Sequence, residues 1–379
     1  MIKPKQQVIH NPIEPIKRIV IKVGSALLID GKKAAVRKKW LTTLAEDIAK
    51  LQQQGKQVIV VSSGSIALGR KVLGYGLREL TLSERQAAAA AGQPLLMKAW
   101  QEALASHHIK TAQLLITADD TEKRKSFLNM RNAVDTLIAS QIVPIINEND
   151  VITAKGERVG DNDRLSARAA QMIHAGLLVL LSDIDGLYTK DPNRHEDAEH
   201  LPFVPEVNKK IRAMAGPART ATSSGGMRTK IEAANIATAG GCHMVICRGD
   251  ILFPLSSLQN GAKFTLFLGQ EQALSARKGW IVGTLEPKGS VVIDDGAVNA
   301  LKRGNSLLPA GVIQVDGHFA RGDAVWITDS HGAKIAKGLS AYNSDDADQI
   351  KGHQSDAIKK VLGFKARDVL INRDDMVML

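Results

Sequence analysis

The sequence has few cysteines, few aromatic residues and no long apolar run. Cys242 and Cys247 are its two cysteines, and because no second pair accompanies them, their spacing matches no zinc motif. We expect both to be buried thiols in a cytoplasmic protein, where the reducing environment disfavours disulfides. No apolar segment follows the charged N-terminus or reaches the length of a membrane span, so we expect neither a secretory signal nor membrane association.

Aromatic residues make up only 4% of the chain, whereas hydrophobic residues make up 44%. This balance is typical of an α/β protein with a core of Ala, Val, Ile and Leu. The sequence has no internal repeat and no low-complexity segment. With 379 residues, the chain is long enough for two domains.

Positive charge is concentrated in the first part of the chain. The net charge is +11, but residues 1–278 hold 38 Lys and Arg against 26 Asp and Glu, whereas residues 279–379 hold 12 against 13. A nucleic-acid site would therefore have to lie in the first part. A small anionic substrate bound there explains part of the surplus equally well.

Strand and helix patterns alternate from residue 16 to residue 270. They predict a mostly parallel sheet with helices on both faces, in which the strand at 243–247 is the last. Residues 1–15 are polar and contain three prolines, so we expect a flexible extension. Residues 271–278 form the expected linker. Short β-like runs between Gly and Asp turns then predict a smaller, mainly β domain over 279–379.

One polar stretch separates a predicted strand from a predicted helix. The apolar run 142–146 ends in polar residues, and a helical pattern begins about fifteen residues later. Open α/β sheets bind ligands at such strand ends and helix starts. A turn closed by a helix N-cap is the simpler alternative, but it explains one polar residue and not all four. The four are Asp150, Asp161, Asn162 and Asp163.

Two lysines and a turn of small residues also lie at predicted strand ends or helix starts. Lys22 ends the strand 17–23, either as a charge on an edge strand or as a catalytic charge. Lys230 lies in the first turn of a helix, where the helix dipole disfavours a cation. The turn 62–65 presents backbone N–H groups to an anion. The run from Gly64 to Lys71 resembles a Walker A loop by spacing, but Arg70 replaces the lysine and no Ser or Thr follows it, so we reject that interpretation.

These groups are the parts that phosphoryl transfer requires. The transferring group carries its charge on equatorial oxygens, so catalysis depends on positioning and on fixed positive charge. Two lysines can supply that charge, and an aspartate between them can orient both ammonium groups. The hypothesis requires that these residues converge in the fold.

The sequence resembles the amino acid kinase family over nearly its whole length. The matching stretches are 21–25, 61–70, 144–150, 159–165, 182–189 and 225–230. The segment from about Trp280 resembles the PUA domain that bacterial members of this family carry. Each motif alone is weak, but their combination is specific.

The resemblance implies a function. It implies transfer of the ATP γ-phosphoryl group to the side-chain carboxylate of L-glutamate, which gives glutamyl 5-phosphate in the first step of proline biosynthesis. Mg²⁺ is implied as well, held through the nucleotide phosphates, and we assign it no protein ligand. Members of the family are typically oligomers that proline inhibits, so we expect a homo-dimer or homo-tetramer and feedback inhibition by proline.

The resemblance also implies roles for individual residues. Lys22 and Lys230 would stabilise the moving phosphoryl group, and Asp163 would orient both lysines. Asp150 is a suitable partner for the ammonium group of glutamate. The implied glutamate ligands are Ser63, Asp150 and Asn162.

The implied nucleotide site combines a strand end and a Gly-rich loop. Ser182 stands where the family often has Thr, which retains the hydroxyl group. The implied ATP-binding residues are Lys22, Ser182, Asp183, Ser224, Gly225, Gly226, Met227, Arg228, Thr229 and Lys230.

Two alternatives remain at this point. A kinase of the same fold could phosphorylate N-acetylglutamate or aspartate, although Asp150 should favour a free ammonium group over an acetylated nitrogen. An RNA-binding protein is the alternative from another class, because PUA domains elsewhere bind RNA and the pI is about 9.5. RNA affinity rests largely on Lys and Arg, and the net charge of −1 over 279–379 argues against it. We expect that domain to be structural or regulatory.

Overall fold

The structure is a computed structural model of the 379-residue chain. It describes residues 10–31, 33–122, 124–152, 162–215, 226–270, 286–365 and 367–379. Contacts between residues divide the chain into two compact units, Met1–Gln270 and Glu271–Leu379. Within the described ranges, no helix is both long and apolar enough to cross a bilayer.

The expected extension and linker fall mostly on residues outside these ranges. Residues 1–9 and 271–278 are not described. Ile13, however, is fully buried in the core of the first unit. The packed chain therefore begins before residue 16, and the last residues of the expected extension belong to the domain.

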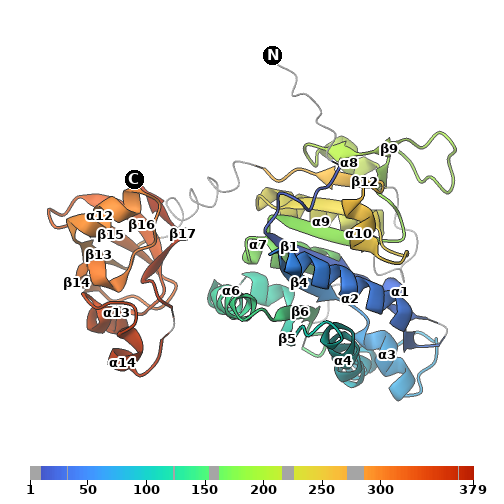
Figure 1. Cartoon of the computed structure of the whole chain (residues 1–379), viewed down its shortest axis with the longest axis horizontal. Helices are drawn as coiled ribbons and strands as arrows, with labels where there is room; N and C mark the ends of the chain where they lie inside the picture. The colour runs from blue at the N-terminus through green and yellow to red at the C-terminus, as the bar shows by residue number, and fades with distance from the viewer. Residues whose placement is uncertain are drawn as a thin grey trace, which may run out of the picture. The chain divides into compact units, whose positions relative to one another are not determined.

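An eight-stranded sheet organises the first unit (Figure 1). The strands lie in the order β10-β12-β11-β7-β1-β4-β6-β5. Neighbours from β11 to β5 are parallel, whereas β12 runs antiparallel to β11. The strands are β1 (Arg18–Val23), β4 (Gln57–Ser62), β5 (Thr111–Ile116), β6 (Val143–Glu148), β7 (Leu177–Ser182), β10 (Phe203–Val204), β11 (His243–Arg248) and β12 (Phe264–Phe267).

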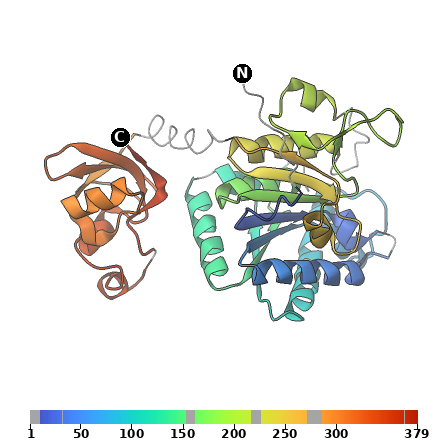
Figure 2. The same ribbon diagram turned by 45° about the horizontal axis from the view of Figure 1, so that its top comes forward.

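Helices cover both faces of this sheet, as Figure 2 shows for the blue α2 and the yellow α9. The mostly parallel sheet between helices confirms the predicted fold class. The prediction that the strand at 243–247 is the last was wrong, because β12 follows it and pairs with it. The main helices are α2 (Lys38–Gln53), α3 (Ser65–Val72), α4 (Leu82–Ala105), α6 (Arg124–Ala139), α7 (Asn162–Met172) and α9 (Met227–Ala239).

Shorter elements complete the first unit. They lie between the main strands and helices or just beyond them. They are α1 (Ser25–Leu28), β2 (Ile29–Asp30), β3 (Ala35–Val36), α5 (Ala118–Glu122), β8 (Leu187–Tyr188), β9 (His200–Leu201), α8 (Lys209–Ala213) and α10 (Pro254–Gln259).

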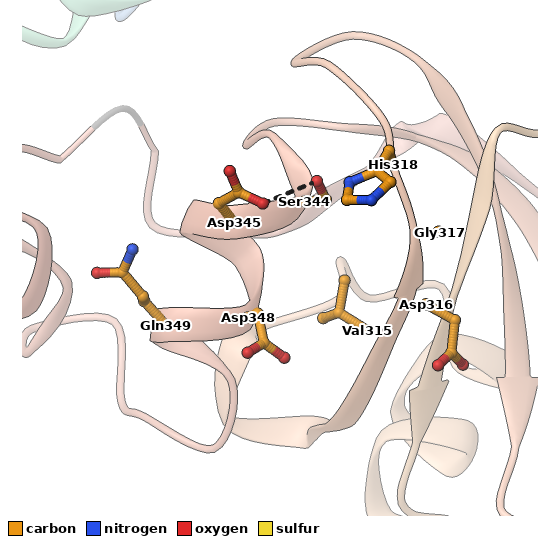
Figure 3. Close-up of a pocket in the computed structure, with 8 residues that line it drawn as sticks. All are labelled: Val315, Asp316, Gly317, His318, Ser344, Asp345, Asp348 and Gln349. Atoms are coloured by element: carbon orange, nitrogen blue, oxygen red, sulfur yellow. Dashed lines mark hydrogen bonds between the residues drawn. The ribbon is translucent and has the colours of Figure 1, made fainter.

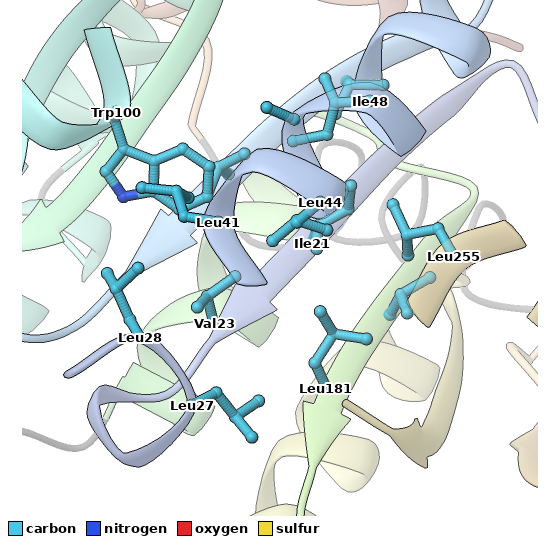
Figure 4. Packing of buried hydrophobic residues seen from close by; sticks show 14 of the residues in the cluster. Ile21, Val23, Leu27, Leu28, Leu41, Leu44, Ile48, Trp100, Leu181 and Leu255 are labelled. Carbon is cyan, nitrogen blue, oxygen red and sulfur yellow. The ribbon is translucent and has the colours of Figure 1, made fainter. Parts of the chain in front are cut away.

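Alternate side chains of β1 enter two different cores. Ile19 and Ile21 pack with α2 and α4, in the cluster that Figure 4 shows. Val20 packs instead with α7 and α9. Because side chains alternate along a strand, Lys22 lies on the same side as Val20. The only cation within β1's apolar run therefore faces the two helices that carry Asp163 and Lys230.

Two glycines allow α3 and α4 to cross with their backbones almost in contact. A Cβ on Gly92 would lie 1.8 Å from the carbonyl oxygen of Ser65, and one on Gly69 would lie 1.8 Å from that of Ala88. Only a residue without a side chain fits at either position. The crossing brings Ser65, the first residue of α3, close to the middle of α4.

The second unit has its own sheet and its own core. Its strands lie in the order β14-β13-β15-β16-β17, and β13 is antiparallel to β14 but parallel to β15. Its core includes the fully buried Ile293 and Val325. The elements are β13 (Gly289–Ile293), α12 (Asp295–Lys302), the 3-10 helix η1 (Pro309–Gly311), β14 (Val312–Gly317), β15 (Ala324–Asp329), β16 (Lys334–Ser340), α13 (Ser344–Ile350), α14 (Ile358–Leu362) and β17 (Ile371–Met378).

The mainly β character of this unit agrees with the prediction, but two strands were missed. Of the four β-like runs in the sequence, those at 290–293, 312–315 and 324–327 form β13, β14 and β15, and the run at 281–285 lies outside the described residues. The sequence pattern did not identify β16 and β17.

Replacing Gly92 by alanine should destabilise the first unit. The new methyl group would meet backbone and could not be relieved by a side-chain rotation, so we expect a loss of about 1–3 kcal/mol in the free energy of unfolding. Gly31→Ala is the matched control, because a Cβ there would meet nothing within 4 Å. Urea unfolding of both variants measures the difference, and equal stabilities would contradict the close crossing.

Candidate active site

The candidate site lies where the chain switches sides of the sheet. From β1 the chain passes to β4 on one side, and later it returns to the other side of β1 as β7. Open α/β sheets bind ligands outside the carboxyl ends of strands at such a point. Since β1 pairs with β4 and β7, it is a central strand, and the alternative that Lys22 protects an edge was wrong.

Lys22, Asp163 and Lys230 converge at this point. The ammonium group of Lys22 lies 2.5 Å from Asp163 Oδ1, and that of Lys230 lies 3.7 Å from Asp163 Oδ2. The two lysines are each 8% exposed and Asp163 is 2% exposed. Asp163 lies in the first turn of α7 and Lys230 in the first turn of α9. Asp163 is thus inside its helix, not a simple N-cap.

The charges of these three described residues do not balance. Burial by itself raises the pKa of Asp163, but the positive charges of Lys22 and Lys230 and the hydrogen bonds to the carboxylate lower it to about 2. Asp163 is therefore ionised at neutral pH and compensates one of the two ammonium charges. A buried charge without a partner is costly, so the site favours an added anion.

Asn162 connects this charged group to a neighbouring cluster of polar side chains. Its amide nitrogen donates to Ser63 Oγ at 2.7 Å and lies 3.4 Å from Asn147 Oδ1. Ser63 follows β4 directly, and Asn147 lies at the end of β6. Two adjacent residues of α7 therefore face different parts of the site.

Asp150 lies at the other end of that cluster. It is 5% exposed, and Ser65 Oγ donates to its Oδ2 at 3.4 Å. Burial raises the pKa of Asp150 to about 6, although the Ser65 hydrogen bond and the charge of Arg85 oppose the increase. Its Oδ1 is buried and accepts no hydrogen bond from the described residues. A buried carboxylate with an open oxygen is suited to a cationic group of a ligand.

Three polar residues of this cluster were not assigned a role from the sequence. Asn147 donates to Gln93 Oε1 at 2.8 Å and lies 3.4 Å from Ser65 Oγ. Asn147 belongs to the polar end of a buried strand, which was a usable signal. Ser65 and Gln93 lie on α3 and α4, and only the close crossing of these helices brings them here.

The expected nucleotide residues lie on the side of β7 and α9. Ser182 is buried at the end of β7, and its hydroxyl donates to Asp183 Oδ1 at 3.0 Å. Gly226 precedes α9, whose first backbone N–H groups have no partner within the helix and can bind an anion. Arg228 pairs with Glu232 at 3.3 Å.

Two further expected residues can be placed and two cannot. Met227 begins α9 and is partly exposed. Thr229 is buried, and its hydroxyl donates to Asp163 Oδ2 at 2.7 Å. Ser224 and Gly225, like Asp161, lie outside the described residues.

A separate hollow of about 490 Å³ lies on the second unit (Figure 3). Its lining carries three carboxylates and no lysine or arginine, so it does not suit a phosphate. The lining residues are Val315, Asp316, Gly317, His318, Ser344, Asp345, Asp348 and Gln349. We therefore keep the candidate site on the first unit.

Comparison with known protein families assigns each of the two units to a family. The sequence model of the amino acid kinase family matches residues 17–248, and that of the PUA domain matches residues 289–362. Carbamate kinase from Giardia lamblia bound to AMP-PNP has a similar structure, with a TM-score of 0.50 and 15% identity over 66% of this chain and 98% of that chain. At this identity the similarity concerns the fold alone.

Relatives of matching length are much more similar in sequence. The glutamate 5-kinase of Rhodopseudomonas palustris (strain BisB18) is 52% identical over 370 residues, which cover 97% of this chain and 98% of the relative. The glutamate 5-kinase of Paramagnetospirillum magneticum is 50% identical over 368 residues, which cover 97% of this chain and 99% of the relative. The family matches and these relatives show that the chain belongs to the amino acid kinase family and carries a PUA domain.

Proposed function

We propose that the chain transfers the γ-phosphoryl group of ATP to the side-chain carboxylate of L-glutamate, the first step of proline biosynthesis. The observation that carries the proposal is the buried pair of ammonium groups on one carboxylate, with distances of 2.5 and 3.7 Å. One positive charge is left for the oxygens of a transferring phosphoryl group. The relatives named glutamate 5-kinase support this choice of reaction.

The acceptor chemistry fits a site without a general base. A glutamate side chain has a pKa of about 4.3, so it is already an ionised nucleophile at neutral pH. The chain's task is to hold that carboxylate in line with the phosphoryl group and to offset the repulsion between two anions. Lys22 and Lys230 supply the positive charge, and Asp163 keeps the two ammonium groups in place.

The nucleotide would bind on the side of α9. ATP supplies the phosphoryl group, and we propose that Mg²⁺ accompanies it through the phosphate oxygens. The first N–H groups of α9 and the ammonium group of Lys230 are suited to phosphates. Ser182 and Asp183 would line the same side, at the end of β7.

Glutamate would bind on the side of β4 and β6. Asp150 Oδ1 is open and suits the α-ammonium group, while Ser63 and Asn162 would hold the remaining polar groups. An acetylated nitrogen has no charge, so it would leave Asp150 buried without a cation. This difference favours free glutamate over N-acetylglutamate.

Regulation and assembly are part of the same proposal. Proline carries an ammonium group and an α-carboxylate but no side-chain carboxylate, so it would occupy the glutamate pocket without reacting. We propose that it acts as a feedback inhibitor of a cytoplasmic homo-oligomer, a dimer or a tetramer. The second unit would have a structural or regulatory role, without RNA binding.

A substrate comparison tests the reaction. ADP release from Mg-ATP should be clear with L-glutamate and at least tenfold slower with N-acetyl-L-glutamate and L-aspartate, because only glutamate meets both Asp150 and the phosphoryl group. Added proline should lower the rate and raise the KM for glutamate. Turnover with N-acetyl-L-glutamate in place of glutamate would overturn the role of Asp150 but not the phosphoryl-transfer chemistry.

Lys22→Met should remove most of the turnover. One fixed charge on the transferring group is worth roughly a hundredfold to a thousandfold in kcat. Lys50→Met is the matched control, because Lys50 is an exposed lysine paired with Glu46 on α2; it should retain full activity. Steady-state kinetics with circular dichroism as a folding check measures the difference, and an active Lys22→Met enzyme would remove Lys22 from the mechanism.

The pH dependence of the KM for glutamate should show whether Asp150 binds the substrate. Because burial raises the pKa of Asp150 to about 6, the free enzyme loses this negative charge as the pH falls through 6. The KM for glutamate should therefore rise by up to about tenfold per pH unit below 6 and level off above it. Asp150→Asn should bind glutamate weakly, with a KM that stays flat between pH 5 and pH 8. A flat profile in the unsubstituted enzyme would contradict the assignment.

A further inference from the structure

The two lysines lie at different distances from the carboxylate of Asp163. The ammonium group of Lys22 lies 2.5 Å from Oδ1, a close ion pair, whereas that of Lys230 lies 3.7 Å from Oδ2, beyond hydrogen-bond distance. The close donor to Oδ2 is the hydroxyl of Thr229, at 2.7 Å. Both carboxylate oxygens therefore have a near donor without any hydrogen bond from Lys230.

Thr229 has a second acceptor in reach, but its hydroxyl can donate only once. The carbonyl oxygen of Gly226 lies 2.9 Å away. The Asp163 oxygen is nearer and charged, and hydrogen bonds to charged acceptors are the stronger ones. The Thr229 hydrogen is therefore assigned to Asp163. Thr229 is also 8% exposed, so water cannot readily take its place.

We propose that Thr229 is a positioning residue that leaves the ammonium group of Lys230 available to the transferring phosphoryl group. This inference rests on the proposed phosphoryl transfer and assigns the Thr229 hydroxyl to Asp163 and not to the nucleotide. An ammonium group has three N–H donors, and none of those on Lys230 is used by Asp163 at 3.7 Å. Lys22 is then the anchored lysine and Lys230 the available one.

Removal of the Thr229 hydroxyl should make the ammonium group of Lys230 less available to the phosphoryl group. Asp163 Oδ2 would be a buried acceptor without its close donor, which is unfavourable. Lys230 carries the next donor in reach, since it is already ion-paired to the same oxygen. Its ammonium group would move toward Asp163 and away from the phosphoryl group, and the chemical step would slow.

Thr229→Val tests the proposal, because valine keeps the shape and removes the hydroxyl. We expect kcat to fall by about tenfold to a hundredfold, while the KM for glutamate stays within about twofold, since the hydrogen bonds described for Ser63, Asn162 and Asp150 do not involve Thr229. Thr229→Ser, which restores the hydroxyl, should recover most of kcat. Thr229→Ala also lacks the hydroxyl and takes the place of valine if that variant does not fold.

Thr238→Val is the matched control within the same helix. Thr238 is also buried in α9, but its hydroxyl donates to the backbone oxygen of Ala234 at 2.8 Å. It should lose stability to a similar extent and keep kcat within about twofold. Thermal unfolding followed by circular dichroism sets the assay temperature well below the transition of every variant.

The outcomes separate this inference from the proposed function. If the unsubstituted enzyme does not phosphorylate glutamate, the proposed function fails. If it does, and Thr229→Val or Thr229→Ala keeps kcat within twofold, the positioning role fails alone. The positioning role also fails if Thr229→Ser is as slow as Thr229→Val, because the hydroxyl would then not be the responsible group.

Discussion

One carboxylate between two buried ammonium groups is the constraint on which the rest of the first unit depends. Asp163 can reach both lysines only if α7 and α9 begin side by side above the end of β1. Small side chains allow this approach, because Ala167, Ala169, Ala233 and Ala234 are all fully buried between these helices and the sheet. The position of β1 in the middle of the sheet then keeps Lys22 away from bulk water.

The two sides of the site are built from different parts of the fold. In the proposed reaction, the phosphates bind at β1, β7, α7 and α9, and these elements carry Lys22 and Lys230. Glutamate binds at β4, β6, α3 and α4, where hydrogen-bonded amide and hydroxyl groups extend to one carboxylate, Asp150. This separation suits a reaction between two anions, because each can be bound by groups of its own.

Short sequence patterns made some helices and strands of the first unit predictable. The capping box of Thr81 and Glu84 gives the start of α4, and the apolar runs give the central strands with their polar ends. β12 was missed because Phe264–Phe267 is four residues long and its antiparallel pairing with β11 is a non-local contact. Gln93 could not be assigned either, since a glutamine in an Ala-rich helix gives no sign of its partners until Gly92 has fixed the crossing with α3.

The first turn of α7 carries consecutive residues that serve both halves of the site, Asn162 toward Ser63 and Asp163 toward the lysines. A rigid helical turn cannot adjust one of these side chains through its backbone without displacing the other. A displacement of this turn on one side of the site would therefore move the side chain that faces the other side. The spacing between the lysines and the Ser63 side of the site is thus set by two neighbouring residues of one helical turn.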